Sequence, residues 1–572
     1  MRFKPYNQKD YAQTKLCLDD LVPLSHEVRF VDEIISSLDL SLLYESYSLR
    51  GASSYDPLLM TKVLFYSYLT GAYSSRAIEK KLRENVCLMW LSGGATPDHN
   101  TINRFRLKFM VQLPVLFKEL VHLIHQQGFV SLEKVSLDGT KWEANVNKYR
   151  FVWGKRVSKN KAKLEAQLTD LNELIAAQVT EDHLSTVPQD IEGWSHRIKE
   201  WKTLLDADKI KDTDLIPSIK KFNKEAISRL KDYAMHQRIL GDRNSYAKTD
   251  TDATFMRLKD DAMKNGQLKA AYNVQMGTEN QFITSYSIHQ KSNDFGTLIP
   301  HLEENRTIYQ ERLKDVCADA GYGSEQNYQY LEKEGLEAYV KYPLFYQQSK
   351  KSFAKNKPFH PDLLFYNEVG DFLVCPMGQK MRKIGERVQK TTLGYPQKYS
   401  VYKAINCEGC PIRGRCHQAK GERIIHYNHQ LKEYQKKAKE KLNSDEGIKH
   451  RKQRGIDVEA VFGQLKQNWR FTRISLRSIP KVTLEVGLMA IAHNLRILYR
   501  KTLQNQQNQP IEQNSFSKSQ KTRSVTRYFT VLSFVCSIKR INTKSLPISI
   551  MRQPRLFMRF QCMRQHFYLP SL

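Results

Sequence analysis

The sequence lacks any apolar run of the roughly 18 residues that a helix needs to span a bilayer. Its N-terminus, MRFKPYNQKDYAQTK, also lacks the apolar stretch of a secretory signal. These two absences predict a protein of the cytoplasm with no membrane association. In that compartment the nine cysteines are expected to be reduced thiols or metal ligands rather than disulfides.

Acidic residues are scarce compared with basic ones. The 572-residue chain has 60 Asp and Glu against 90 Lys and Arg, a formal net charge of +30. Such an excess favours a polyanionic partner, above all nucleic acid, although a basic surface without a binding patch would give the same count. Hydrophobic residues make up 41% of the chain, so we expect a globular protein of several domains rather than a disordered one.

Two regions have helical patterns. Residues 1–130 contain short amphipathic segments with tight polar turns, and one of them carries Arg104 and Arg106. This organisation resembles a helix-turn-helix DNA-binding region, but a plain helical bundle would have the same spacing. Residues 155–245 place Leu164, Leu168 and Leu171 on one helical stripe. We interpret this region as a helical insertion, an antiparallel pair with a coiled-coil seam.

Strand patterns flank the second helical region. The segment KVSLDG is followed, after the insertion, by a hairpin pattern, a helix, the strand DVCADAGYG, a helix and the strand LEAYVKYP. The order β, β, β, α, β, α, β predicts an α/β fold with a ribonuclease H-like mixed sheet. In such a sheet the strands ending at Asp138 and Asp319 are neighbours. The alternative for Asp319 is that it only shapes a turn before glycine.

Two neighbouring carboxylates predict a metal site. Carboxylate oxygens suit Mg²⁺ or Mn²⁺, and a pair of such ions can activate a nucleophile and stabilise the leaving oxygen of a phosphodiester. We expect Glu459, on the helical segment DVEAVFGQLK, to be the third carboxylate, with Arg454 and Lys466 gripping the DNA backbone. A surface glutamate with basic neighbours is the simpler alternative, and Asp457 is a weaker rival for the third position.

The region 344–440 interrupts this core. It contains the segments VCPMGQKM and NCEGCPIRGRC. The close pair of cysteines in the second segment is typical of a structural Zn²⁺ site. The alternative is that the four cysteines are free thiols in a β-rich insertion. The candidate zinc ligands are Cys375, Cys407, Cys410 and Cys416. The last part, 504–572, is basic and without helical or strand periodicity, and we predict that it is disordered or an extension past the natural end.

Three ordered motifs carry a resemblance that covers residues 20 to 500. SLDGTKWEANV, ADAGYGSEQNYQYL and DVEAVFGQLKQNWRF resemble the first-aspartate, second-aspartate and glutamate motifs of the DDE transposases of bacterial insertion sequences. The segment SYDPLLMTKVLFYSYL onward resembles the N-terminal transposase domain of the branch with a cysteine-bearing insertion. The resemblance implies that Asp138, Asp319 and Glu459 bind the metal. A tyrosine that relatives have before the arginine is missing from GIKHRKQR, so its contact with the DNA end is not carried over.

The resemblance also implies a function: metal-dependent cleavage at the element ends and transfer of the strands into target DNA. The partners would be double-stranded DNA, as terminal inverted repeats and as target, and a homodimer or larger assembly at the bacterial nucleoid. Two rivals stay open, a ribonuclease H-like nuclease that cuts without joining and an inactive, transposase-derived DNA-binding protein. The catalytic core is predicted at 131–154, 246–343 and 441–503.

Overall fold

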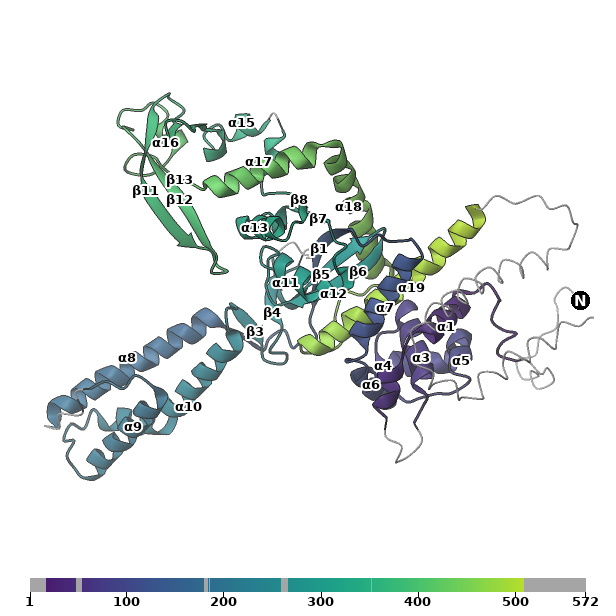
Figure 1. Cartoon of the computed structure of the whole chain (residues 1–572). Helices are drawn as coiled ribbons and strands as arrows, with labels where there is room; N and C mark the ends of the chain where they lie inside the picture. The colour runs from purple at the N-terminus through teal and green to yellow at the C-terminus, as the bar shows by residue number, and fades with distance from the viewer. Residues whose placement is uncertain are drawn as a thin grey trace, which may run out of the picture. The chain divides into compact units, whose positions relative to one another are not determined.

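The computed structural model describes residues 17–47, 54–179, 184, 186–258, 266–350 and 352–508. The secondary structure is mixed α and β (Figure 1). Contacts divide the chain into two units, residues 1–112 with 495–572, and residues 113–494. No helix within the described ranges is long and apolar enough to cross a membrane. Of the region 504–572 that we predicted to be disordered, residues 504–508 continue a helix, and the rest, from residue 509 onward, lies outside the described residues.

The first unit is helical, and its helices start where the sequence supplies caps. The Asp56 carboxylate accepts from the backbone N–H of Leu58 and Leu59, and Pro57 occupies the first helical turn. Ser74 and Asp98 cap two further helices in the same way. The helices are α1 (Glu27–Ser37), α2 (Ser41–Glu45), α3 (Pro57–Leu69), α4 (Ser75–Glu84), α5 (Val86–Leu91), α6 (His99–Lys108) and the end of α19 (Ile479–Asn508).

A six-stranded mixed sheet forms the centre of the second unit. Its order is β4-β5-β1-β7-β8, and β6 also pairs with β5. The strand β1 is antiparallel to β5 and parallel to β7, which is parallel to β8. The strands are β1 (Lys134–Glu143), β4 (Thr254–Arg257), β5 (Leu268–Glu279), β6 (Phe282–His289), β7 (Asp315–Ala318) and β8 (Glu337–Val340). The prediction that the strand containing Asp138 and the strand before Asp319 are neighbours is therefore confirmed.

Several helices accompany this sheet. The helix α18 packs across β1 and β7, so it faces the centre of the sheet. The helices of this part are α7 (Leu113–Gln126), α11 (Leu298–Glu304), α12 (Arg306–Tyr309), α13 (Glu325–Lys333), α17 (His429–Asn443) and α18 (Asp445–Gly463), with short 3-10 and π segments at η3 (Ala320–Tyr322) and η5 (Gln464–Asn468). The sequence predicts α7 as part of the N-terminal region 1–130, but α7 groups with the sheet, where the Phe117 ring packs edge-on against Tyr286 of β6 at 4.9 Å.

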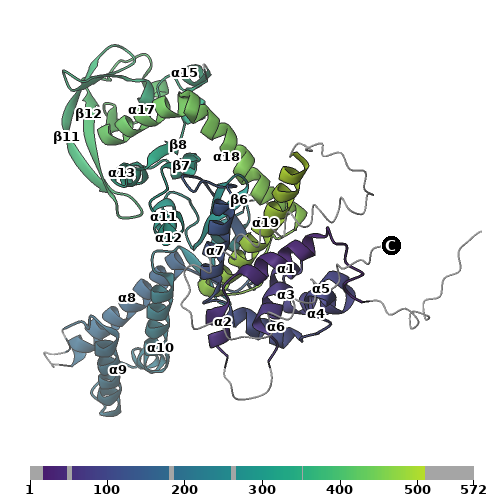
Figure 2. The same ribbon diagram turned by 45° about the vertical axis from the view of Figure 1, so that its right-hand side comes forward.

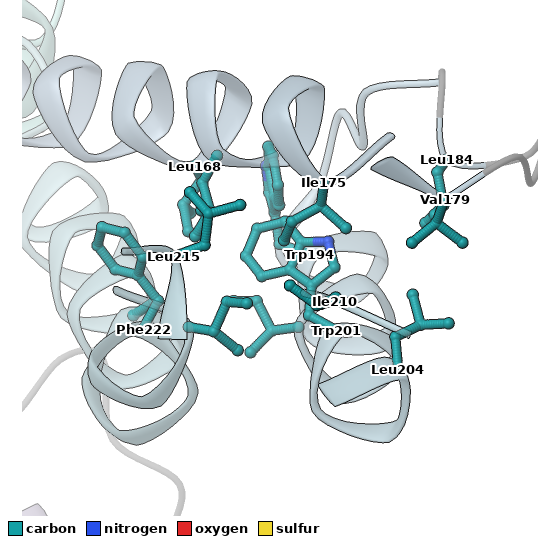
Figure 3. Packing of buried hydrophobic residues seen from close by; sticks show 14 of the residues in the cluster. Leu168, Ile175, Val179, Leu184, Trp194, Trp201, Leu204, Ile210, Leu215 and Phe222 are labelled. Atoms are coloured by element: carbon teal, nitrogen blue, oxygen red, sulfur yellow. The ribbon is translucent and has the colours of Figure 1, made fainter. Parts of the chain in front are cut away.

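The helical insertion has three helices rather than the predicted pair. They are α8 (Gly154–Gln178), α9 (Ile191–Asp206) and α10 (Ile216–Leu240), rooted at the short strands β2 (Phe151–Trp153) and β3 (Ser245–Ala247). Figure 3 shows Trp194 and Trp201 of α9 among leucine and isoleucine side chains of the other helices. These two indoles are large and fully buried, so their burial requires partners on both α8 and α10. This apolar core accounts for the third helix.

The cysteine-containing insertion is a five-stranded antiparallel sheet, in agreement with the β-rich prediction. Its order is β13-β12-β11-β10-β9. Figures 1 and 2 show β11 and β12 as a hairpin much longer than the other strands of this sheet. The elements are α14 (Phe345–Gln348), α15 (Ser352–Asn356), η4 (Pro361–Leu363), β9 (Phe365–Asn367), β10 (Phe372–Val374), β11 (Lys380–Lys390), β12 (Pro396–Ala404), α16 (Arg413–Cys416) and β13 (Ile424–Tyr427).

Candidate active site

The pairing of β1 with β7 brings Asp138 and Asp319 next to each other on the sheet. Leu137 is paired in register with Ala318, so the next residues, Asp138 within β1 and Asp319 just after the end of β7, lie beside each other. The predicted end of the first strand at Asp138 is wrong, because β1 continues to Glu143 in register with β5. Only Asp319 follows the carboxyl end of its strand, a position where α/β sheets commonly bind ligands. The two aspartates are therefore neighbours although the sequence separates them widely.

Both aspartates are held by the backbone in the same way. Asp138 Oδ1 accepts from the N–H of Gly139 at 2.8 Å, and Asp319 Oδ1 accepts from the N–H of Gly321 at 2.8 Å. In each case the other oxygen, Oδ2, faces the guanidinium of Arg454 on α18. The distances from Arg454 Nη2 are 3.2 Å to Asp138 and 4.0 Å to Asp319. One positive group thus compensates two negative ones.

Arg454 is held in a largely buried position. Its side chain is 12% exposed, and in the described part of the chain its Nε and Nη2 atoms form no hydrogen bond. A guanidinium that has left water needs opposite charge nearby, and the two carboxylates supply it. Our prediction gave Arg454 a role on DNA, whereas the structure places it on the aspartates. The point between two convergent carboxylate oxygens is also where hard oxygen donors would hold a divalent cation.

Glu459 lies on α18 but on a different face from Arg454. Five residues of α-helix rotate a side chain by about 500°, which leaves the two residues roughly 140° apart. Glu459 is exposed, and it has no ion pair or hydrogen bond with any described residue. Lys466 lies further along, in the π-helical segment η5, and is half-buried. The structure therefore brings together Asp138, Asp319 and Arg454 but not Glu459.

Asp457, the rival third carboxylate, is buried and has a structural partner. It accepts from Gln453 Nε2 at 2.8 Å and from the backbone of Asn280 and Gln281, the turn residues of the β5–β6 hairpin. Both turn residues have positive φ, 50° and 68°, a conformation that costs energy for residues other than glycine. Asp457 thus stabilises a strained turn. Its position indicates a role in folding rather than in binding metal.

This placement predicts that Asp457→Asn keeps the folded state and Asp457→Ala loses stability. The amide still accepts from the turn, whereas alanine leaves buried N–H groups unsatisfied at a cost of about 1–3 kcal/mol. Burial is the largest influence on the Asp457 carboxyl and raises its pKa. A raised folded-state pKa means stability that is present at low pH and is lost as the pH rises through that pKa. In denaturant unfolding, the free energy of unfolding of Asp457→Asn should therefore increase relative to that of the wild type as the pH rises.

Asp294 is a carboxylate of this region that the sequence analysis missed. Its Oδ1 accepts from the fully buried amides of Asn273 at 2.8 Å and Gln275 at 3.1 Å. A Cβ placed on Gly139 would come within 2.8 Å of Asp294 Oδ1, so Asp294 lies directly against the strand that carries Asp138. The only sequence signal was its place at the end of the hairpin, just before α11.

Tyr322 follows the second aspartate and is fully buried beneath it. Its hydroxyl donates to Gln275 Oε1. Burial raises the pKa of Tyr322 well above its usual value, and the negative charges of Asp294, Asp138 and Asp319 act in the same direction. A tyrosine that stays neutral can serve as a permanent donor in this network. Three carboxylates and one guanidinium therefore share one corner of the sheet.

One other cluster of potential ligands lies near α18. Among the described residues, the single group of three His, Cys, Asp or Glu ligand atoms within 4.8 Å of one another is Asp315, Glu446 and His450. Asp315 begins β7, so this group is at the opposite end of the strand from Asp319. His450 Nε2 is 3.5 Å from Asp315 and 3.9 Å from Glu446, and its ring lies 4.2 Å from that of Tyr339. His450 is thus held between the two carboxylates and packed against an aromatic ring, which accounts for the cluster without a metal.

The basic residues predicted on α6 divide into one exposed and one buried. Arg104 is exposed. Arg106 is 4% exposed, and its guanidinium donates to the Tyr73 carbonyl at 3.0 Å and to Asn103 Oδ1 at 2.9 Å. This burial contradicts the prediction that Arg106 contacts DNA. The alternation of Arg, Phe and Arg along α6 does not predict which arginine is buried, because that depends on packing against other parts of the chain.

The four predicted zinc ligands line one pocket of the cysteine-containing insertion, together with His417 and Arg423. Arg423 donates through Nη1 to Cys416 Sγ at 3.0 Å and through its backbone N–H to Cys407 Sγ at 3.5 Å. Neither imidazole nitrogen of His417 has a hydrogen-bond partner among the described residues. No three of the four sulfur atoms lie within 4.8 Å of one another, so they would have to draw together around a metal.

Comparisons with known families identify two segments of the chain. Residues 374–499 match the family described as "Transposase DDE domain", and residues 16–108 match the family described as "Transposase domain (DUF772)". The first match includes the cysteine pocket, Arg454 and Glu459, but not Asp138 or Asp319. No curated protein and no solved structure matches the chain. The two family matches, in separate parts of one sequence, support its assignment as a DDE transposase of the insertion-sequence type.

Proposed function

We propose that the protein cleaves DNA at the ends of its element and joins the released 3′-hydroxyls to target DNA. The observation that carries this proposal is the convergence of Asp138 Oδ2 and Asp319 Oδ2 on one guanidinium. Two carboxylates held side by side on a sheet can bind the divalent metal that phosphodiester chemistry of this kind uses. The transposase family matches supply the substrate class.

We further propose that the sheet is ribonuclease H-like. The order β6-β5-β1-β7-β8 has one antiparallel side, made by the hairpin, and one parallel side, joined through helices. This arrangement is the one that the strand order in the sequence predicts. It supports the assignment of the first and second aspartates, since one lies on the central strand and the other directly follows its parallel neighbour.

The residues present suit a divalent cation of the Mg²⁺ or Mn²⁺ type. Asp138 and Asp319 would hold it through oxygen ligands, and Glu459 remains our proposed third ligand. When bound, the metal supplies an activated hydroxyl and neutralises charge on the reacting phosphate. Arg454 would then exchange the aspartates for a phosphate, since guanidinium binds both kinds of anion. Lys466 and Arg104 would add contacts to the DNA backbone.

Because Glu459 is exposed and turned from Arg454, its role requires a change in the segment that follows Arg454. The π-helical η5 is directly adjacent, and π-helical segments often lie at functional sites. We propose that DNA binding turns Glu459 toward the aspartates. Asp294 is the competing carboxylate, because it already lies beside them.

A direct assay decides between these carboxylates. The substrate is a duplex carrying the inverted repeats that flank the gene, incubated with Mg²⁺ and a target plasmid. Glu459→Gln is expected to lower cleavage and joining at least about 10²-fold, whereas Asp457→Asn should stay within about threefold of wild type. If Glu459→Gln kept full activity and Asp294→Asn lost it, Asp294 rather than Glu459 would be the third metal-binding carboxylate.

The same assay separates the rival functions. Cleavage without joined products would indicate a ribonuclease H-like nuclease. DNA binding without either product, under conditions where the protein is folded, would indicate an inactive transposase-derived binding protein. The mass of the wild-type protein–DNA complex, measured by light scattering, tests whether a dimer or larger assembly forms on the double-stranded element ends and the target DNA.

A further inference from the structure

The strand β11 is exposed on both of its faces. All of its residues except Met381 are exposed, and its partner β12 is buried only toward its end at the small core of the insertion. Ile384 and Val388 are 57% and 64% exposed. A two-stranded ribbon that buries so little surface gains little stability from packing. Its length therefore calls for another explanation, such as a partner that covers it.

The ribbon also carries basic residues without acidic partners. Arg382, Arg387 and Lys390 form no ion pair or side-chain hydrogen bond with any described residue. Other lysines of the same sheet are neutralised: Lys398 pairs with Glu386 at 2.7 Å and Lys403 with Glu422 at 3.0 Å. Uncompensated guanidinium groups on an exposed strand fit a polyanion.

A β-bulge sets the direction of the two arginines. The register shifts between Lys383 and Gly385, so Arg382 is opposite Lys403 and Arg387 is opposite Tyr399. Since Lys403 and Tyr399 are four residues apart on a regular strand, the arginines opposite them share one face. Four residues of strand cover about 13 Å, comparable with the roughly 12 Å width of the DNA major groove, which admits a two-stranded ribbon.

The tip of the ribbon is fixed next to the carboxylates. A Cβ on Gly296 would come within 2.8 Å of Leu393 Cδ1, so the turn of the ribbon lies against the loop that carries Asp294. Tyr395 Oη donates to Gln329 Oε1 at 2.8 Å, and Gln397 Nε2 donates to the buried carboxylate of Glu325 at 2.9 Å. Both acceptors are on α13, which follows the Asp319 turn. A duplex on the ribbon would therefore reach the site.

We infer that the β11–β12 ribbon binds the phosphate backbone of the DNA duplex whose strand enters the Asp138–Asp319 site, with Arg382 and Arg387 as its anchors. This inference rests on the proposed function, because it assigns a surface to the DNA substrate. The contacts are with phosphates, so they position the duplex and carry no sequence preference of their own.

The test is duplex binding by Arg382→Gln/Arg387→Gln, measured at several salt concentrations without added Mg²⁺ and in an Asp319→Asn background that prevents cleavage. The matched control is Lys199→Gln/Lys202→Gln, which removes the same charge from exposed positions of α9. We expect the ribbon variant to bind at least about tenfold more weakly. The slope of log K against log salt should lose about two units, because each lost phosphate contact removes roughly 0.9.

Three other results have defined meanings. Equal weakening in the ribbon variant and the α9 control would show that affinity follows net charge, and would overturn the ribbon inference. Wild-type affinity in the ribbon variant would overturn it too, leaving the proposed chemistry intact. Absence of duplex binding by every chain, including the parent, would overturn the proposed function together with the inference. Equal thermal melting of the variants shows that they are folded.

Discussion

Asp319→Asn is expected to lower DNA cleavage and joining at least about 10³-fold while duplex binding persists. The substitution removes one negative oxygen from the pair that faces Arg454, and a 10³-fold loss corresponds to about 4 kcal/mol of transition-state stabilisation. Asparagine keeps an acceptor for the Gly321 N–H, so the turn after β7 is preserved. Product formation on the inverted-repeat duplex and binding in the absence of Mg²⁺ should be measured on the same preparation.

The reference variants for this experiment are Asp138→Asn and Asp457→Asn. The first should behave like Asp319→Asn, because it removes the equivalent oxygen at the other side of Arg454. The second should remain active, because Asp457 supports the hairpin turn. If Asp319→Asn cleaved and joined DNA at the wild-type rate, Asp319 would be a turn residue and the site would have to be sought elsewhere.

Cys407→Ser is expected to abolish zinc binding by the insertion. Purified wild-type protein should contain about one zinc per chain, because four thiolates with one close pair suit tetrahedral Zn²⁺. Binding to a structural site of this kind contributes on the order of 10 kcal/mol to folding, so its loss should unfold the small sheet locally. The core there is only a few side chains, among them Leu373, Met381 and Tyr402. Metal analysis and proteolysis within 357–428 measure the two effects.

The matched control is Cys17→Ser, which replaces an exposed thiol outside the pocket and should keep both zinc and stability. His417→Ala adds a second comparison, since its two buried nitrogens are also without partners among the described residues. If His417→Ala lost zinc and Cys375→Ser kept it, His417 rather than Cys375 would be the fourth zinc ligand. A wild-type protein free of zinc after purification without chelators would refute the site and leave four reduced thiols.

Arg454 explains how the carboxylates of Asp138 and Asp319 remain close to each other. The sequence motif suggested a contact with DNA, and the structure shows a contact with the aspartates. The two roles are compatible, because a guanidinium binds carboxylate and phosphate with similar geometry. Arg454→Gln should therefore raise the affinity of the site for Mn²⁺ in the absence of DNA, which calorimetry can measure, while lowering the affinity for duplex.

The sequence alone determined the sheet and the two neighbouring aspartates on it. Strand order follows from patterns that are local, such as the apolar run before Asp138 and the one before Asp319, and parallel pairing of those strands follows from the chain connectivity. The caps of the N-terminal helices were equally local, since Asp56 and Ser74 satisfy N–H groups within three residues. Information of this kind lies within a few positions of the residue it concerns.

Only the tertiary structure decided which side chains meet. It turned Arg106 inward, placed Asp294 beside the first aspartate, gave Asp457 to a hairpin turn, and brought Arg454 instead of Glu459 to the carboxylates. It also added a third helix to the insertion through the burial of Trp194 and Trp201. Helical spacing fixes the angle between two side chains, but the face that turns toward the sheet depends on packing against residues far away in the sequence.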